Sequence, residues 1–172
     1  PHVIASARRA RHIHACTRTH AVLSMPLQDP LSRLLSVGAP ALEQPALAVV
    51  WPDAALTQET ATLHAALGAF RVRHGFGRAI AAPQLGIRKR FIAVNLNGRC
   101  TTLINPRITW RSTATFEVWD DCMSVPDVEV RVRRNCSVSV TFVNASGAPE
   151  LWNQLPADTS ELLQHEVDHL DG

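Results

Sequence analysis

The chain has 172 residues, 46% of them hydrophobic, and a formal net charge of +2, which predicts one globular domain with a substantial core. No apolar run is long enough to cross a membrane, and the small, scattered positive charge does not favour nucleic-acid binding. The four cysteines form no CxxC pair, which favours a reducing compartment.

Residues 1–28 contain no Asp or Glu but several arginines, at Arg8, Arg9, Arg11 and Arg18. An acid-poor, Arg-rich start is typical of an organellar targeting segment, and an extension ahead of a start at Met25 explains it equally well. We therefore interpret residues 1–28 as an N-terminal extension, either targeting or non-native, and residues 29–172 as the single folded domain. A cytoplasmic location is expected, or an organelle if the extension directs import.

Residues 54–74 are predicted to form a helix. Asp53 is suited to cap its first turn, and apolar residues recur at helical spacing up to Gly75, at Leu56, Leu63, Leu67 and Phe70. A loop rich in Gly, Ala and Pro follows, over residues 75–86. Runs typical of strands come next, separated by turn residues such as Asn105-Pro106, at residues 90–95, 101–104, 108–110, 115–118, 128–132 and 137–143.

Asp158 or Thr159 can cap a final helix. The order of helix, several strands and helix indicates an α+β fold, mostly of antiparallel sheets packed around that C-terminal helix.

The final helix carries His165-Glu166-x-x-His169. Residues four apart lie on one helix face, so both imidazoles can bind a single metal ion. Catalytic sites of this kind use three protein ligands. Only three residues follow His169, so the third ligand is expected upstream, and Cys122 is the best candidate because it stands in an irregular acidic segment between strands.

A metal held by one thiolate and two imidazoles lowers the pKa of its bound water and produces a hydroxide nucleophile. Glu166 can take the water's proton and deliver it to a leaving amine, as general base and then general acid. Asp168 has two interpretations of equal weight, as a residue that orients an imidazole or as a member of a surface ion pair.

Three segments, in order, resemble the motifs of peptide deformylase. Residues 77–86 are similar to GxGxAAPQxG, residues 120–124 to EGCLS, and residues 164–172 to QHExDHLxG. The resemblance covers about residues 30–172. It implies a catalytic domain that hydrolyses the N-formyl group from N-formylmethionyl peptides or from nascent chains at the ribosome, as a monomer with one divalent ion. Iron(II) is the expected metal, with zinc, nickel or cobalt as substitutes.

The resemblance also implies roles for individual residues. The side chain of Gln84 and the backbone N–H of Met123 would stabilise the oxyanion formed from the formyl group. The peptide backbone would pair near Gly77 and Ala79, and Asp120 could pair with Arg134 to support the metal ligands.

The chain departs from the family where the methionine side chain binds. Two positions that are usually apolar are Arg78 and Glu161, while Val118 is expected to keep one apolar wall. We predict that Arg78 and Glu161 pair and narrow or polarise this pocket; the alternative is that both side chains turn to solvent. The family's usual basic contact to the peptide is replaced by Glu129.

Family members usually continue past the position of Gly172, so we expect a truncated domain whose last helix has poorly capped carbonyls and reduced stability. Two other functions stay open: a hydrolase of the same fold that acts on another N-formyl or amide substrate, and a non-catalytic binding derivative.

Overall fold

The computed structural model describes residues 28–172. The predicted extension therefore lies outside the described residues, except for Gln28. The elements run in the order η1 (Pro40–Glu43), α1 (Leu56–His74), β1 (Ala79–Ala81), η2 (Ala82–Leu85), β2 (Phe91–Leu96), β3 (Arg99–Arg111), β4 (Thr115–Cys122), β5 (Val125–Asn135), β6 (Val138–Val143), β7 (Pro149–Trp152) and α2 (Ala157–Asp171). In the described part of the chain, neither helix is long and apolar enough to cross a membrane.

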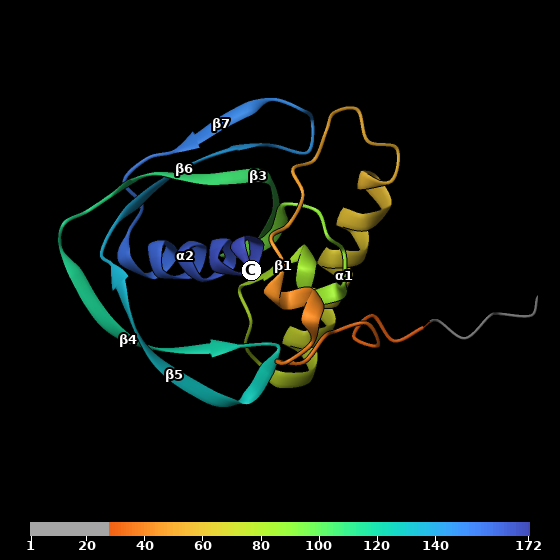
Figure 1. Cartoon of the computed structure of the whole chain (residues 1–172), viewed down its shortest axis with the longest axis horizontal. Helices are drawn as coiled ribbons and strands as arrows, with labels where there is room; N and C mark the ends of the chain where they lie inside the picture. The colour runs from red at the N-terminus through yellow and green to blue at the C-terminus, as the bar shows by residue number, and fades with distance from the viewer. Residues whose placement is uncertain (1–27) are drawn as a thin grey trace, which may run out of the picture.

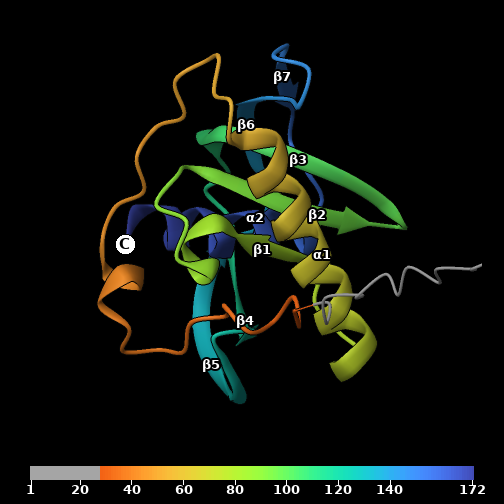
Figure 2. The same cartoon turned by 90° about the vertical axis from the view of Figure 1, so that its right-hand side faces the viewer.

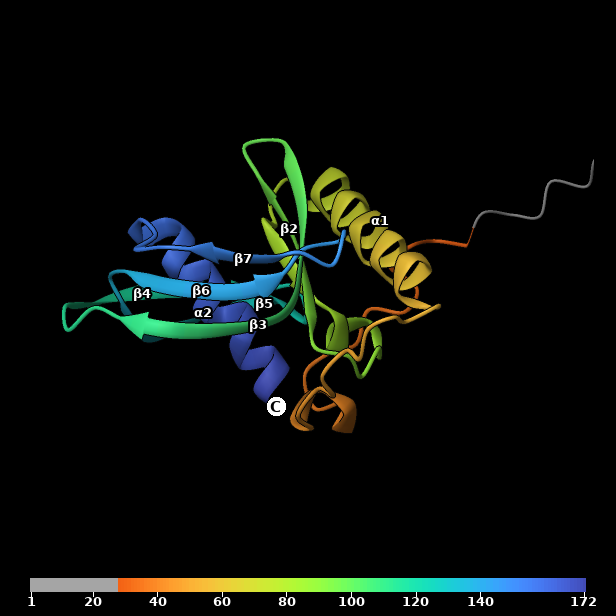
Figure 3. The same cartoon turned by 90° about the horizontal axis from the view of Figure 1, so that it is seen from above.

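Five strands form an antiparallel sheet in the order β1-β2-β3-β6-β7, with one helix packed on each of its faces. Strand β2 shows how both faces of the sheet can be apolar, because alternate residues of a strand point to opposite faces. Phe91 and Ala93 join the core under α1, whereas Ile92 and Val94 join the core that contains Leu163 of α2. Figures 2 and 3 show α1 lying against the side of the sheet formed by β1 and β2.

Strands β4 and β5 form a separate two-stranded antiparallel sheet. Figure 1 shows α2 between this hairpin and the larger sheet, so the helix is surrounded by strands. The apolar side chains of α2 face the larger sheet, at Leu162, Leu163, Val167 and Leu170. The predicted α+β fold, with antiparallel sheets around the C-terminal helix, is confirmed.

The strand prediction was wrong in three places. Residues 101–104 and 108–110 belong to one long strand, β3, because Asn105 adopts a positive φ of 52° and makes an irregularity in the pairing instead of a turn. Its side chain also holds the segment before α1, accepting from the N–H of Val49 at 2.8 Å. Strands β1 and β7 were not predicted.

The predicted helix caps were also wrong. Helix α1 begins at Leu56, so Asp53 lies ahead of it, where its carboxylate accepts from the N–H of Ala55. Helix α2 begins at Ala157 after Pro156, which places Asp158 and Thr159 inside its first turn.

The end of α2 is better capped than expected. The carbonyl of Leu170 accepts from the N–H of Ala46 at 2.9 Å and from the guanidinium of Arg90 at 3.3 Å. Gly172 donates its N–H to the carbonyl of Asp168. Ala46, in the segment before α1, and Arg90, just before β2, therefore satisfy the carbonyl of Leu170, which was expected to lack a partner.

Candidate metal centre and active site

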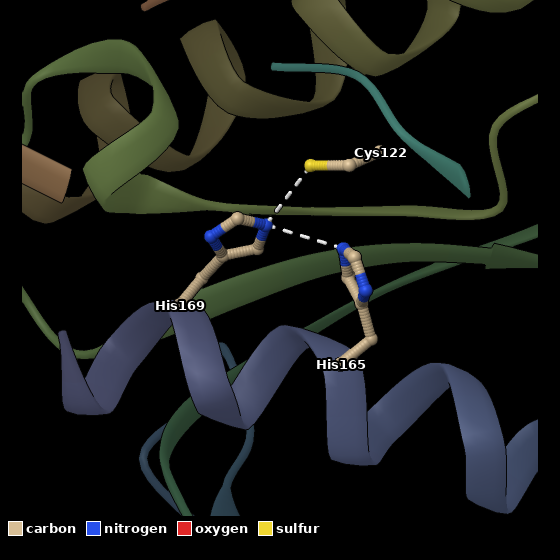
Figure 4. Close-up of side chains that lie close together, drawn as sticks. All are labelled: Cys122, His165 and His169. Atoms are coloured by element: carbon tan, nitrogen blue, oxygen red, sulfur yellow. Dashed lines mark hydrogen bonds between the residues drawn. The ribbon is translucent and has the colours of Figure 1, made fainter. Parts of the chain in front are cut away.

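Cys122, His165 and His169 form a cluster in which one ligand atom from each lies within 4.8 Å of the others. Figure 4 shows the two imidazoles rising from α2 towards the thiol. The Nε2 atom of His169 lies 3.2 Å from the sulfur of Cys122 and 3.2 Å from Nε2 of His165. This donor set, one sulfur and two imidazole nitrogens directed at a common point, fits a zinc or iron(II) ion.

Cys122 is the last residue of β4, not part of an irregular segment as predicted. The pairing of β4 with β5 shifts between Asp121 and Cys122, and this irregularity directs the thiol towards α2. Burial raises the pKa of the thiol, but hydrogen bonds with His165 and His169 outweigh burial and lower it to about 6. A thiol with a lowered pKa gives up its proton readily when a metal binds.

Asp120 fixes the orientation of His165. One carboxylate oxygen lies 2.9 Å from Nδ1 of His165, and the other accepts from Arg134 at 2.8 Å. With Nδ1 donating its hydrogen to Asp120, Nε2 presents its lone pair to the cluster. Burial acts to raise the pKa of Asp120, but the bonds with His165 and Arg134 hold it below its usual range.

Asp168 contacts the same guanidinium from its exposed side. It makes the surface ion pair that was one of its two predicted interpretations, and it does not contact an imidazole in the part of the chain that the structure describes.

Replacing Asp120 by alanine is expected to weaken metal binding by about 10- to 100-fold, because His165 loses the acceptor that sets its ring. Asp168→Ala is the matched control, since it removes the other carboxylate from Arg134 without touching His165. Metal affinity measured by competition with a chelator should fall only for Asp120→Ala. Equal losses in the two variants would contradict a role for Asp120 in orienting the ligand.

Glu166 lies beside the cluster and is 3% exposed. One of its carboxylate oxygens, Oε2, is buried without a hydrogen-bond partner among the described residues. Burial raises the pKa of Glu166 to about 7, although His165 and His169 act to lower it. A buried carboxylate with a free oxygen is costly to stability and is typical of a group held ready for proton transfer.

Gln84 directs its amide nitrogen towards the cluster. Its Oε1 accepts from the backbone N–H of Ala81 at 2.8 Å, which fixes the orientation of the amide. Its Nε2 then donates to Ser124 at 3.2 Å and lies 3.7 Å from the sulfur of Cys122. Met123 lies in the turn between β4 and β5, outside the strand pairing. Ser124, the last residue of the segment similar to EGCLS, was not predicted to have a role at the site.

A cavity of about 270 Å³ opens beside the cluster and reaches Gln84, His165 and Glu166. Arg78 and Glu161 both line it, and their side chains form the predicted ion pair at 2.9 Å. Val118, expected as an apolar wall, does not line this cavity. Its apolar lining includes Phe76, Met123 and Leu162. Of these three, only Met123 was expected at the site, and only for its backbone N–H.

Gly77 and Ala79, near which the peptide backbone was expected to pair, line the cavity. Gly77 has a φ of 103°, and an added Cβ would lie 2.7 Å from the terminal carbon of Met123. Ala79 is an ordinary strand residue of β1, paired with Val94, so the change from the family's glycine costs little.

Gly77→Ala is expected to destabilise the fold by more than the about 1–3 kcal/mol that a positive φ costs alone, because Met123 must also move. Gly98→Ala is the control: its φ is 82°, but an added Cβ would meet nothing within 4 Å. Chemical denaturation should show a larger loss in the free energy of unfolding for Gly77→Ala than for Gly98→Ala. Equal losses would mean that Met123 adapts freely.

Comparison with known proteins supports the resemblance over nearly the whole described chain. Residues 31–172 match the sequence model of the family described as polypeptide deformylase. A peptide deformylase of Prochlorococcus marinus (strain NATL2A) is 30% identical over 155 residues, which cover 86% of this chain and 72% of the relative.

Solved structures agree with the sequence comparison. The peptide deformylase of Synechococcus elongatus, crystallised in complex with actinonin, superposes with a TM-score of 0.75 at 30% identity, covering 84% of this chain and 76% of that chain. A probable peptide deformylase from Synechococcus phage S-SSM7 gives a TM-score of 0.71 at 31% identity, covering 80% of this chain and 92% of that chain. The chain therefore belongs to the peptide deformylase family.

Proposed function

We propose that this chain removes the N-formyl group from N-formylmethionyl peptides and nascent chains, with a divalent ion held by Cys122, His165 and His169. The observation that carries the proposal is the buried carboxylate of Glu166, whose Oε2 has no partner among the described residues and stands next to this cluster. A protein that only binds metal has no need for such a group, and its burial is costly. This argues against a non-catalytic binding derivative.

The residues of the site divide the chemistry between them. The metal, when bound, polarises the formyl carbonyl and lowers the pKa of a water molecule. Glu166 takes the proton of the attacking water and passes it to the nitrogen of the leaving amine. Gln84 donates from Nε2 to the oxygen that becomes negative, and the backbone N–H of Met123 supplies a second donor. Asp120 and Arg134 keep His165 in the orientation that this chemistry needs.

The substrate backbone has an edge with which to pair. Strand β1 is an edge strand of its sheet: among the described residues it pairs with β2 on one side only. An extended peptide can add to the other side, next to Gly77 and Ala79. This arrangement suits an N-terminal segment that is still unfolded, such as a chain emerging from a ribosome.

The proposal is tested by formate release from formyl-peptides. Protein purified anaerobically is loaded separately with iron(II), zinc, nickel or cobalt, because one thiolate and two imidazoles accept all four. We expect formate release with each metal-loaded form and the highest rate with iron(II). No formate from any peptide, with metal bound in stoichiometric amount, would contradict the proposal.

A second candidate is a hydrolase of the same fold that acts on a different N-formyl or amide substrate. The ion pair between Arg78 and Glu161 inside the cavity favours it, since a charged pair is a poor lining for a thioether side chain.

A further inference from the structure

An ion pair lies where the first side chain of the substrate would enter. Glu161 is on α2 one turn before His165, and both line the cavity together with Arg78, which precedes β1. The guanidinium of Arg78 donates to the carboxylate of Glu161 at 2.9 Å and to the backbone carbonyl of Asp158 at 2.9 Å. Two contacts to the first two turns of α2 therefore hold Arg78 over the cavity.

Both members of the pair keep hydrogen-bonding capacity that no residue in the range 28–172 uses. A guanidinium has five N–H donors, of which two are accounted for by Glu161 and Asp158. Of the two carboxylate oxygens of Glu161, only Oε2 contacts Arg78. The side chain of Glu161 is 12% exposed and that of Arg78 is 42% exposed, so the donors of Arg78 are the more accessible ones.

A bound apolar side chain would displace water from this pair without replacing the hydrogen bonds that the water made. Desolvating charged groups without compensation is costly, and a pocket with polar groups discriminates strongly against ligands that leave them unpaired. A side chain of the same length that ends in an acceptor would instead receive a hydrogen bond from Arg78. A side chain that also carries a hydrogen-bond donor could donate to the carboxylate oxygen of Glu161 that does not contact Arg78.

We propose that Arg78 and Glu161 make this cavity selective for N-formyl peptides whose first side chain has the length of methionine and ends in a hydrogen-bond acceptor. Glutamine and methionine sulfoxide are two uncharged side chains with that chemistry. Norleucine, of the same length and without a polar atom, is the side chain that the pair disfavours. The inference rests on the proposed deformylation, because it assigns the substrate of the same site.

The test compares kcat/KM for formate release from four peptides that differ only in their first residue, formyl-Xaa-Ala-Ser with Xaa as glutamine, methionine sulfoxide, methionine or norleucine. The metal-loaded chain of 172 residues is used. We expect both polar peptides to exceed the norleucine peptide by about tenfold or more. A preference for methionine and norleucine over both polar peptides would overturn the inference while leaving deformylation intact. No formate from any of the four would overturn deformylation itself.

The double variant Arg78→Leu with Glu161→Leu separates the pair from the rest of the pocket. Both residues are changed together, since removing one would leave an unpaired charge beside the cavity. We expect the ratio of polar to norleucine kcat/KM to fall by about tenfold or more. The control double variant, Arg73→Leu with Asp29→Leu, removes an exposed ion pair of the same length, 2.9 Å, and should leave the ratio unchanged. If the ratio of polar to norleucine kcat/KM were unchanged in both double variants, the role of the pair would be overturned. If a variant does not fold, the four peptides measured with the unaltered chain still decide the specificity.

Discussion

Glu166→Gln is expected to lower kcat for formate release by about 10²- to 10⁴-fold, because the chain loses the group that moves the proton between water and leaving amine. The substitution keeps the size and shape of a side chain that is only 3% exposed, so the packing around α2 should persist. Glu166 is not a member of the ligand cluster, so metal content should stay near that of the unaltered chain. The measurements are formate release under saturating peptide and metal content by elemental analysis.

Glu166→Asp provides the conservative comparison. Aspartate keeps a carboxylate but is one methylene shorter, so the carboxylate lies farther from the attacking water. The rate of formate release should therefore lie between those of the unaltered chain and Glu166→Gln. If Glu166→Gln kept full activity with full metal content, another group would have to be the base. If Glu166→Gln lost its metal, Glu166 would be acting on metal retention rather than on proton transfer, and the proposed role would be wrong.

The metal cluster could be predicted because its chemistry leaves few choices. Two histidines four residues apart on a helix must share a face, and a thiolate from Cys122 completes the set of three protein ligands that a catalytic metal needs. The structure brings these three side chains together, although it places Cys122 on a strand. The pairing of Arg78 with Glu161 was predictable in the same way, because opposite charges stood at two positions expected to face one cavity.

Sequence patterns failed where tertiary contacts decide the structure. The Asn-Pro pair at 105–106 resembled a turn, but the side chain of Asn105 bonds to Val49, 56 residues away in sequence, and β3 continues through it. Strand β7 begins with Pro149, a residue that edge strands tolerate but that usually argues against a strand in a sequence pattern. Strand β1 has three residues, all buried, and so shows no alternation of polar and apolar positions. Val118 was expected at the cavity from the family resemblance alone; it lies within β4, paired with Val132, and does not line the cavity.

Gln84→Leu is expected to lower kcat by about 10²- to 10³-fold, because the donor to the developing oxyanion is removed. The structure supports this size of effect, since Gln84 is 1% exposed and its amide is held in one orientation by Ala81. The same bond also means that leucine leaves the Ala81 N–H unpaired, at a cost of about 1–3 kcal/mol in stability. Gln84→Glu keeps an oxygen acceptor for Ala81 but no amide donor, so its rate should fall while the fold is less affected.

Ser124→Ala is the matched control for the Gln84 variants. The amide nitrogen of Gln84 donates to the hydroxyl of Ser124 at 3.2 Å. Removing this hydroxyl leaves the amide donor in place and frees it from a competing acceptor. Formate release should change little in Ser124→Ala, whereas both Gln84 variants should be slow with their metal retained. If Ser124→Ala were as slow as Gln84→Leu, the hydrogen bond between the two side chains, and not donation to the oxyanion, would be what the reaction requires.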